Sequence, residues 1–269
     1  MFKFLHTLKN RVKLSDDTAN GLVTFNLFMG FFHLIQGFIL LFLSNEFSLP
    51  ITTNYLSPDV ATKSANPLLE TIATLKIGPL VAAFLFLSAL AHFTLASPIM
   101  RDWYIKNLKN RINYARWIEY AFSSSIMIVV IAMLCGIYDL SSLILLFALN
   151  AVMNLMGLMM ELHNQTTKKT NWTSFLIGCF AGIVPWIVIT LYFVGAASRA
   201  NGVIPTFVYF ILGSLFVTFN IFAINMFLQY KQVGKWKDYI FGEKAYIVLS
   251  LVAKSLLAWQ VFSGTLRGS

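Results

Sequence analysis

Charged residues are scarce in this chain. Lysine, arginine, aspartate and glutamate make up 12% of its 269 residues, whereas a soluble domain carries about 25%. Hydrophobic residues make up 58%, so an ordinary soluble fold is excluded. The formal net charge of +9 comes from residues between hydrophobic runs. We therefore interpret it as a determinant of membrane orientation rather than as a nucleic-acid-binding surface.

Cysteine is scarce as well. Cys135 and Cys179 both lie in apolar runs and form no CxxC pair, which excludes a disulfide framework and a cysteine-based metal site. We expect both to be small buried hydrophobic residues and expect no metal. The basic N-terminal segment lacks a small-residue cleavage site after the first apolar run, so we expect no removable signal peptide.

Seven hydrophobic runs approach the length of about 20 residues that crosses a bilayer. The predicted spans are Gly21–Leu43, Ile77–Ala96, Arg116–Ile137, Leu140–Leu162, Thr173–Ala196, Pro205–Tyr230 and Ala245–Leu266. They predict an all-α membrane protein, a seven-transmembrane helix bundle over residues 21–266, preceded by a basic arm (1–20) and followed by a tail (267–269). The long loop 44–76 contains proline turn signals and β-branched stretches, which predict a short β-hairpin.

Lysine and arginine are distributed unevenly over the two sides of these spans. Fifteen lie in the N-terminal arm, the second, fourth and sixth loops and the adjoining helix start, and four lie on the other side. Lys254, inside a span, completes the twenty. Because positive residues stay on the cytoplasmic side, we expect a cytoplasmic N-terminus, an extracellular C-terminus and an extracellular hairpin.

Lys254 lies inside the last hydrophobic run, where an ammonium costs about 2.5 to 3.5 kcal/mol. Such an amine either pairs with a buried acid or condenses with a carbonyl compound as a Schiff base. Glu119 lies inside the third run and is the natural partner, because each charge needs an opposite one in a low dielectric. Ser250, one helical turn before Lys254, is placed to donate a hydrogen bond to that carboxylate.

Other polar residues share helix faces inside the spans. His33 and Gln36 are three apart, and Ser88 and His92 are four apart. A single membrane histidine more often forms an interhelical hydrogen bond than acts chemically, and Glu119 has the alternative of extending toward the interface. An amine in an apolar seven-helix bundle, with an acid opposite and aromatic residues nearby, nevertheless fits retinal.

At these residues the chain resembles the heliorhodopsins, retinal proteins with a membrane orientation opposite to that of ordinary microbial rhodopsins. The resemblance covers nearly all of the chain beyond the first twenty residues. The matching blocks are His33–Gln36, Phe47–Tyr55, Arg116–Ser125, Gly178–Trp186 and Gly242–Thr265.

The resemblance implies a role for each matching residue. Lys254 would form the retinal Schiff base, and Glu119 with Ser250 would serve as the counter-ion. A polar cavity on the cytoplasmic side would be bordered by His33, Gln36, Ser88, His92, Tyr104, Asn113 and Ser124. The retinal pocket would be lined by Asn150, Met153, Gly157, Trp186 and Phe219. The resemblance further implies all-trans retinal in the dark and a homodimer in membrane lipid.

We therefore expect a light-sensing photoreceptor rather than a pump or an enzyme. Photoisomerisation would move a proton into the cytoplasmic-side cavity and shift the helices, and the basic face would signal to a cytoplasmic partner that the sequence does not identify, or to anionic lipid. A pump needs a relay across the membrane, and the outer halves of the spans contain no carboxylate before Asp139. The alternatives are a light-gated passive proton channel, a sensory subunit of a membrane enzyme, and a carrier that uses Lys254 as a charge site.

Overall fold

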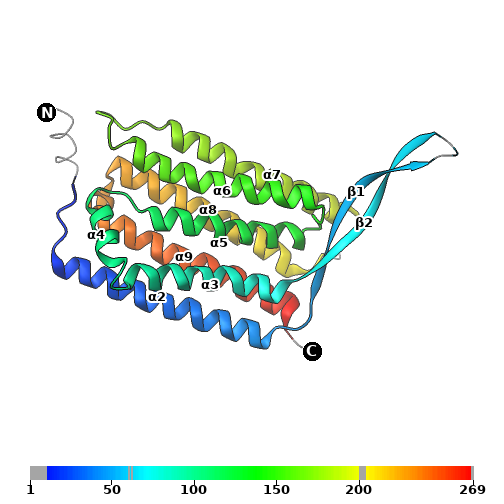
Figure 1. Ribbon diagram of the computed structural model, residues 1–269, viewed down its shortest axis with the longest axis horizontal. Coiled ribbons are helices and arrows are strands. Elements are labelled where there is room, and N and C mark those ends of the chain that lie inside the picture. The colour runs from blue at the N-terminus through cyan, green and yellow to red at the C-terminus, as the bar shows by residue number, and fades with distance from the viewer. Residues whose placement is uncertain (1–10, 60, 62, 200–203, 268–269) are drawn as a thin grey trace.

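Seven long apolar helices form the body of the molecule (Figure 1). The computed structural model describes residues 11–59, 61, 63–199 and 204–267. The long helices are α2 (Asp16–Leu43), α3 (Ile77–Ala96), α5 (Tyr114–Leu134), α6 (Leu140–His163), α7 (Thr173–Arg199), α8 (Thr206–Lys231) and α9 (Tyr239–Val261). Shorter elements are α4 (Arg101–Lys109), a 3-10 helix (Gly234–Lys237) and a π-helical turn (Phe262–Leu266). The predicted all-α membrane fold with seven spans is confirmed.

Helices α2 and α9 begin more than one helical turn before the predicted spans do, because polar residues cap them. Ser15 accepts a hydrogen bond from the Thr18 backbone N–H at 3.2 Å, so α2 starts within the expected basic arm. Asp238 accepts one from the Ile240 backbone N–H at 2.9 Å. Side-chain oxygens at these positions satisfy helix N–H groups that have no partner within the helix. Residues 1–10 of the expected arm and 268–269 of the tail lie outside the described residues.

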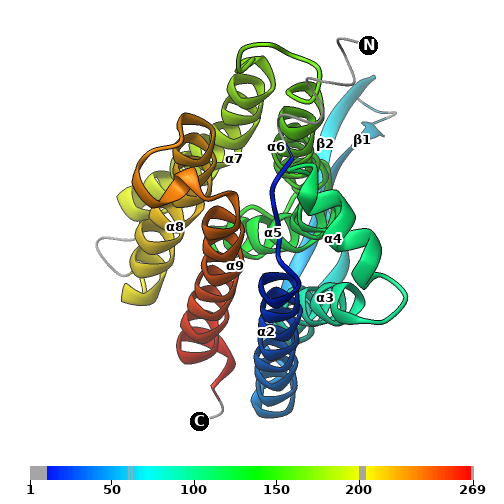
Figure 2. The same ribbon diagram turned by 90° about the vertical axis from the view of Figure 1, so that its left-hand side faces the viewer.

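Helix α5 lies at the centre of the bundle (Figure 2). It is packed between α3 and α6, α7 packs on α6, and α2 contacts both α3 and α9. About 61% of the most apolar stretch of α5 is buried, more than in any other span described. Large apolar side chains such as Phe42, Phe180 and Leu191 are exposed on the outer surface, as expected for residues that face lipid. Cys135 is buried as expected, but Cys179 is exposed on α7, so that expectation was wrong.

The hairpin between α2 and α3 consists of β1 (Ser48–Asp59) and β2 (Ser64–Lys76), and it projects away from the bundle (Figure 1). The strands are antiparallel, with a register shift between Ile51 and Thr52. The Thr52 backbone N–H donates to the Tyr138 carbonyl at 2.9 Å, which ties the hairpin to the turn before α6. The predicted hairpin is confirmed, and its strands of 12 and 13 residues are longer than a short hairpin needs.

The two ends of the bundle differ in charge. We call the end that carries β1, β2 and the C-terminal turn the hairpin end. The opposite end carries the start of α2, helix α4 and the loops after α6 and α8 (Figure 1). We call it the basic end because its described lysines and arginines are Arg11, Lys13, Arg101, Lys106, Lys109, Arg111, Lys168, Lys169, Lys231, Lys235, Lys237 and Lys244. The charge asymmetry of the sequence is therefore an asymmetry between two ends of one bundle.

Candidate functional site

A buried ion pair joins α9 to α5 inside the bundle. The Lys254 Nζ donates to Glu119 Oε1 at 2.9 Å, and the two side chains are 3% and 9% exposed. Nζ also donates to Ser250 Oγ at 2.8 Å, so Ser250 contacts the amine instead of donating to the carboxylate as expected. The Ser88 hydroxyl of α3 lies 2.7 Å from Glu119 Oε1. The geometry therefore brings together the lysine and the acid that the sequence paired.

A small polar cavity lies on the basic-end side of this ion pair. Ser88, His92, Tyr104 and Asn113 line it, together with Glu119 and Ser250. These four are among the seven residues expected at a polar cavity, and they come from α3, α4 and the cap of α5.

His92 and His33 form a stacked pair of rings beside this cavity. His92 Nδ1 lies 2.8 Å from Asn26 Oδ1, and the His33 ring stacks on the His92 ring with centroids 5.6 Å apart. His33 is fully buried, and both its ring nitrogens have no hydrogen-bond partner among the described residues. Asn26, which the sequence reading did not single out, therefore positions the histidine pair.

Gln36 and Ser124 do not line this cavity. Gln36 Oε1 accepts a hydrogen bond from Trp259 Nε1 at 3.0 Å, nearer the hairpin end. Ser124 faces α6, where its Oγ accepts from Asn150 Nδ2 at 2.7 Å and Asn154 Nδ2 at 2.9 Å. The cavity that Ser88, His92, Tyr104 and Asn113 line therefore does not include these two residues.

Two further cavities extend from Lys254 on the side away from the polar cavity. The first, of about 40 Å³, is lined by Lys254, Tyr120, Met153 and Phe219, among others. The second, of about 90 Å³, shares Met153 and Phe219 and also reaches Gly157. Most of the side chains around both are apolar or aromatic. Three residues expected at a retinal pocket therefore line one or both of two adjoining cavities, which form an apolar region that begins at the lysine.

The other two expected pocket residues lie at the edges of this apolar region. Asn150 is buried and donates to Ser124, as described above. The Trp186 ring meets the Phe219 ring edge-on, with centroids 5.6 Å apart. Asn154 lines both cavities and was not among the expected pocket residues. Its position four residues after Asn150 places it on the same face of α6.

A second buried charge cluster connects the polar cavity with the basic end. Arg116, a cavity-lining residue, forms ion pairs with Glu161 of α6 and Glu243 of α9. The Asn113 backbone N–H donates to Glu161 Oε2 at 2.8 Å, and its side chain donates to Glu243 Oε2 at 2.8 Å. The Arg116 guanidinium also lies 4.0 Å from the Tyr246 ring centroid, a favourable cation–π distance.

The sequence reading missed this cluster. In the sequence, Arg116 looks like an interfacial positive charge at the start of its span, and Glu161 lies at the end of another span with no evident partner. The signal that would have identified the cluster is the pair of acids at the same depth on α6 and α9, one near the end of its helix and the other near the start.

The seven spans and a lysine–carboxylate pair between a polar and an apolar cavity define a class of protein, the membrane-embedded retinal-binding rhodopsins. The family model described as Heliorhodopsin matches residues 22–266. Because this match covers nearly the whole chain, the chain belongs to the heliorhodopsin family. It is accordingly a retinal-binding microbial rhodopsin, an integral multi-pass membrane protein and not a classical enzyme. No curated protein matches the chain.

Proposed function

We propose that the protein is a light sensor in which all-trans retinal is attached to Lys254 and Glu119 is the counter-ion. The observation that carries this proposal is the hydrogen bond of 2.9 Å between Nζ and Glu119 Oε1 in a buried setting. Retinal, when bound, supplies a protonated Schiff base and a double bond that light isomerises. The same carboxylate oxygen would then neutralise the nitrogen that now carries the ammonium.

The apolar and aromatic side chains beside Lys254 are of the kind that would line a polyene. A Cβ added at Gly157 would lie 2.4 Å from the Trp117 ring, and one at Gly182 would lie 2.4 Å from Met153 Sδ. Glycine at these two positions therefore lets Trp117 and Met153, which line the cavities, pack close to α6 and α7. Met153 lines both cavities, and methionine is unbranched and flexible, so rotation of this side chain would join them.

The polar groups near Glu119 provide a place for a proton on the basic-end side. Ser88 contacts the Glu119 carboxylate, and His92 lines the same cavity. His33, stacked on His92, has two buried ring nitrogens with no partner among the described residues. We propose that light moves a proton from the Lys254 nitrogen toward these imidazoles, and that the helices shift because the ion pair that holds α5 to α9 is then lost.

In the opposite direction, the described core residues include no histidine and no carboxylate. Between Lys254 and the hairpin end, α5 and α9 pack through fully buried apolar residues such as Ile128, Ile131 and Leu257. Asp139 lies beyond them at the surface, where hydrogen bonds from the Ser141 side chain and the Ser142 backbone lower its pKa. A proton would have to cross an apolar core to reach this carboxylate, which supports sensing over pumping.

We further propose how the protein sits in its membrane. The arm 1–20 and the basic end would face the cytoplasm, and the hairpin and the tail 267–269 would face the outside, because the basic end carries most of the positive charge. The bundle 21–266 would form a homodimer and signal through a cytoplasmic partner. These assignments rest on the charge asymmetry and on what family membership implies.

The test is the membrane current of illuminated cells, clamped at several voltages and supplied with retinal, with Lys254→Ala as control. A sensor gives no Lys254-dependent current although its retinal absorption band is present. An outward current at zero gradient would mean a pump and would overturn the proposal. A current that reverses with the proton gradient would mean a passive proton channel, and would also overturn it.

A further inference from the structure

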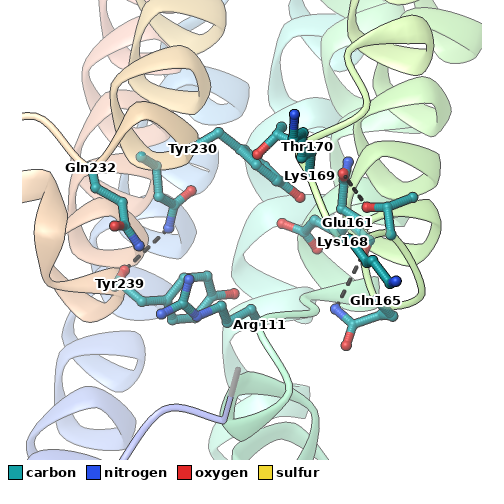
Figure 3. A pocket seen from close by; sticks show the side chains of 12 residues that line it. Arg111, Glu161, Gln165, Lys168, Lys169, Thr170, Tyr230, Gln232 and Tyr239 are labelled. Carbon is teal, nitrogen blue, oxygen red and sulfur yellow. Dashed lines mark hydrogen bonds between the residues drawn. The ribbon is translucent and has the colours of Figure 1, made fainter. Parts of the chain in front are cut away.

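A cavity of about 300 Å³ opens at the basic end, away from Lys254 (Figure 3). Three segments far apart in sequence enclose it: the turn after α4, the loop between α6 and α7, and the end of α8 with the start of α9. The residues that line it are almost all polar: Arg111, Glu161, Asn164, Gln165, Thr167, Lys168, Lys169, Thr170, Gln229, Tyr230, Gln232 and Tyr239. Figure 3 shows Gln232 and Tyr239 across the cavity from Lys168 and Gln165.

The charge of this lining is positive. Arg111, Lys168 and Lys169 contribute three positive charges, and Glu161 contributes one negative charge. The Glu161 oxygens are already engaged, one by the Arg116 guanidinium and the other by the Asn113 backbone N–H. The cations have no such partner: none of the three forms an ion pair with another described residue. The cavity therefore presents uncompensated positive charge among neutral hydrogen-bonding groups.

Two residues of the lining have an unusual backbone conformation. Arg111 and Gln232 have φ angles of 59° and 54°, in the left-handed region that favours glycine. Gln232 directly follows α8, and Arg111 follows Asn110, the C-cap residue of α4. In both cases the backbone N–H of the next residue donates to a carbonyl five residues back, Ile112 to Asn107 and Val233 to Leu228. Glycine is the usual residue at this position of a helix end. Strained residues cluster at functional sites, and here two of the three described non-glycine residues with positive φ line one cavity.

The Arg111 side chain provides an independent observation. Its Nε is buried and has no hydrogen-bond partner among the described residues. An unsatisfied guanidinium N–H is costly, so a movement of the Arg111 side chain that brought this N–H to a ligand in the cavity would be favourable. Opposite, Asn164 holds the loop that carries the lysines, because its Oδ1 accepts from the Asn171 backbone N–H at 2.7 Å. The loop geometry is thus fixed by hydrogen bonds that do not involve Lys168 or Lys169.

We propose that this cavity binds a small multivalent anion of the phosphate class, with Arg111, Lys168 and Lys169 as its charged ligands. Arginine and lysine together suit such an anion, because the guanidinium offers a fixed fork of donors and the ammonium offers a compact charge. Two sources share this chemistry, a soluble phosphate compound and the phosphate of a lipid headgroup at the same membrane face. Because Glu161 lines the site and also belongs to the Arg116 cluster, an anion held here would lie next to the charge network of the bundle.

The test uses the full chain in nanodiscs of phosphatidylcholine and measures the heat of binding of inorganic pyrophosphate, at an ionic strength held constant with chloride. We expect saturable binding of one pyrophosphate per chain. Each charge-assisted hydrogen bond lost weakens binding about tenfold or more, so Arg111→Gly and the double variant Lys168→Gln/Lys169→Gln should both show that loss.

Two matched controls separate the site from general surface charge. Lys63→Gly makes the same kind of change at the third non-glycine residue with positive φ, in the hairpin. The double variant Lys235→Gln/Lys237→Gln removes two cations from the basic end that do not line the cavity. Neither should change the binding constant. Equal losses in the Lys235/Lys237 and Lys168/Lys169 variants, or no saturable binding by the unmodified chain, would overturn the proposal.

The thermal stability of Arg111→Gly gives a second readout that does not depend on the ligand. Glycine relaxes the left-handed position, so this variant should unfold at an equal or higher temperature while it loses pyrophosphate binding. A fall in stability together with unchanged binding would assign Arg111 a structural role and overturn its place in the site. Nanodiscs made with an equal mixture of phosphatidylcholine and phosphatidylglycerol then identify the source: competition with pyrophosphate supports a lipid headgroup, and its absence supports a soluble anion.

Discussion

Replacing Arg116 by glutamine should destabilise the bundle more than replacing either of its acidic partners. In the Arg116–Glu161–Glu243 cluster the three side chains are 5% exposed or less, and their formal charges add to one negative charge. Arg116→Gln leaves two unpaired carboxylates in the bundle. Breaking a buried pair by removing one partner costs about 3–5 kcal/mol, and here one arginine serves both acids.

Glu161→Gln leaves a different charge balance. One carboxylate and the guanidinium remain, so the cluster becomes neutral and the Arg116–Glu243 ion pair persists. We expect this variant to cost about 1.5–3 kcal/mol, the range for one hydrogen bond to a charged group. Arg116→Lys should fall between the two, because a lysine ammonium cannot present the guanidinium fork to two acids.

The assay is thermal or denaturant unfolding of the purified chain in one detergent, followed by circular dichroism at the helix band. The double variant Glu161→Gln/Glu243→Gln is the informative comparison, because it leaves Arg116 buried without an acid and should be worse than either single change. If Arg116→Gln and Glu161→Gln unfold at the same midpoint, unpaired buried charge does not determine the loss of stability. That result would refute the reasoning and would mean that the cluster contributes through side-chain packing alone.

Three further predictions concern the centre and the hairpin end. Glu119→Gln should remove the long-wavelength retinal band at neutral pH while retinal still binds, as absorbance spectra would show; an unchanged band would contradict the counter-ion assignment. Gly157→Ala should impair retinal uptake, because its Cβ would lie 2.4 Å from the Trp117 ring; Gly213→Ala, with nothing within 4 Å, is the control, and equal uptake by both would contradict the pocket. The Asp139 carboxylate should stabilise the folded chain above its unfolded pKa of 3.8, and this stabilisation should be lost as pH falls through the lowered folded pKa. Asp139→Asn should abolish this contribution; melting temperatures that decline equally with pH in the variant and the unmodified chain would contradict this.

The spans, the hairpin and the central ion pair could be predicted from the sequence because each depends on one strong signal. Lys254 inside an apolar run requires a partner, and Glu119 is the acid embedded deepest in another run. The charge clusters at the ends of spans could not be predicted in the same way. Arg116 and Glu243 lie where charged residues ordinarily reach water, and only the packing of α5 against α9 shows that they are buried.

Gln36 and Ser124 illustrate a second limit. Ser123, Ser124 and Ser125 are consecutive, and successive side chains on a helix point about 100° apart. Spacing alone therefore does not say which of them faces a given neighbour. In the structure Ser124 meets the asparagines of α6, while Gln36 meets Trp259. Both contacts depend on the rotation of a helix about its own axis, which tertiary packing determines.

The most direct test of the central claim is the site of retinal attachment. The purified chain is loaded with retinal, reduced with borohydride under illumination, digested and analysed by mass spectrometry. The account predicts a single retinyl adduct on the peptide that contains Lys254, and no adduct in Lys254→Ala. An adduct on another lysine, or a retinal band that survives in Lys254→Ala without any adduct, would contradict it.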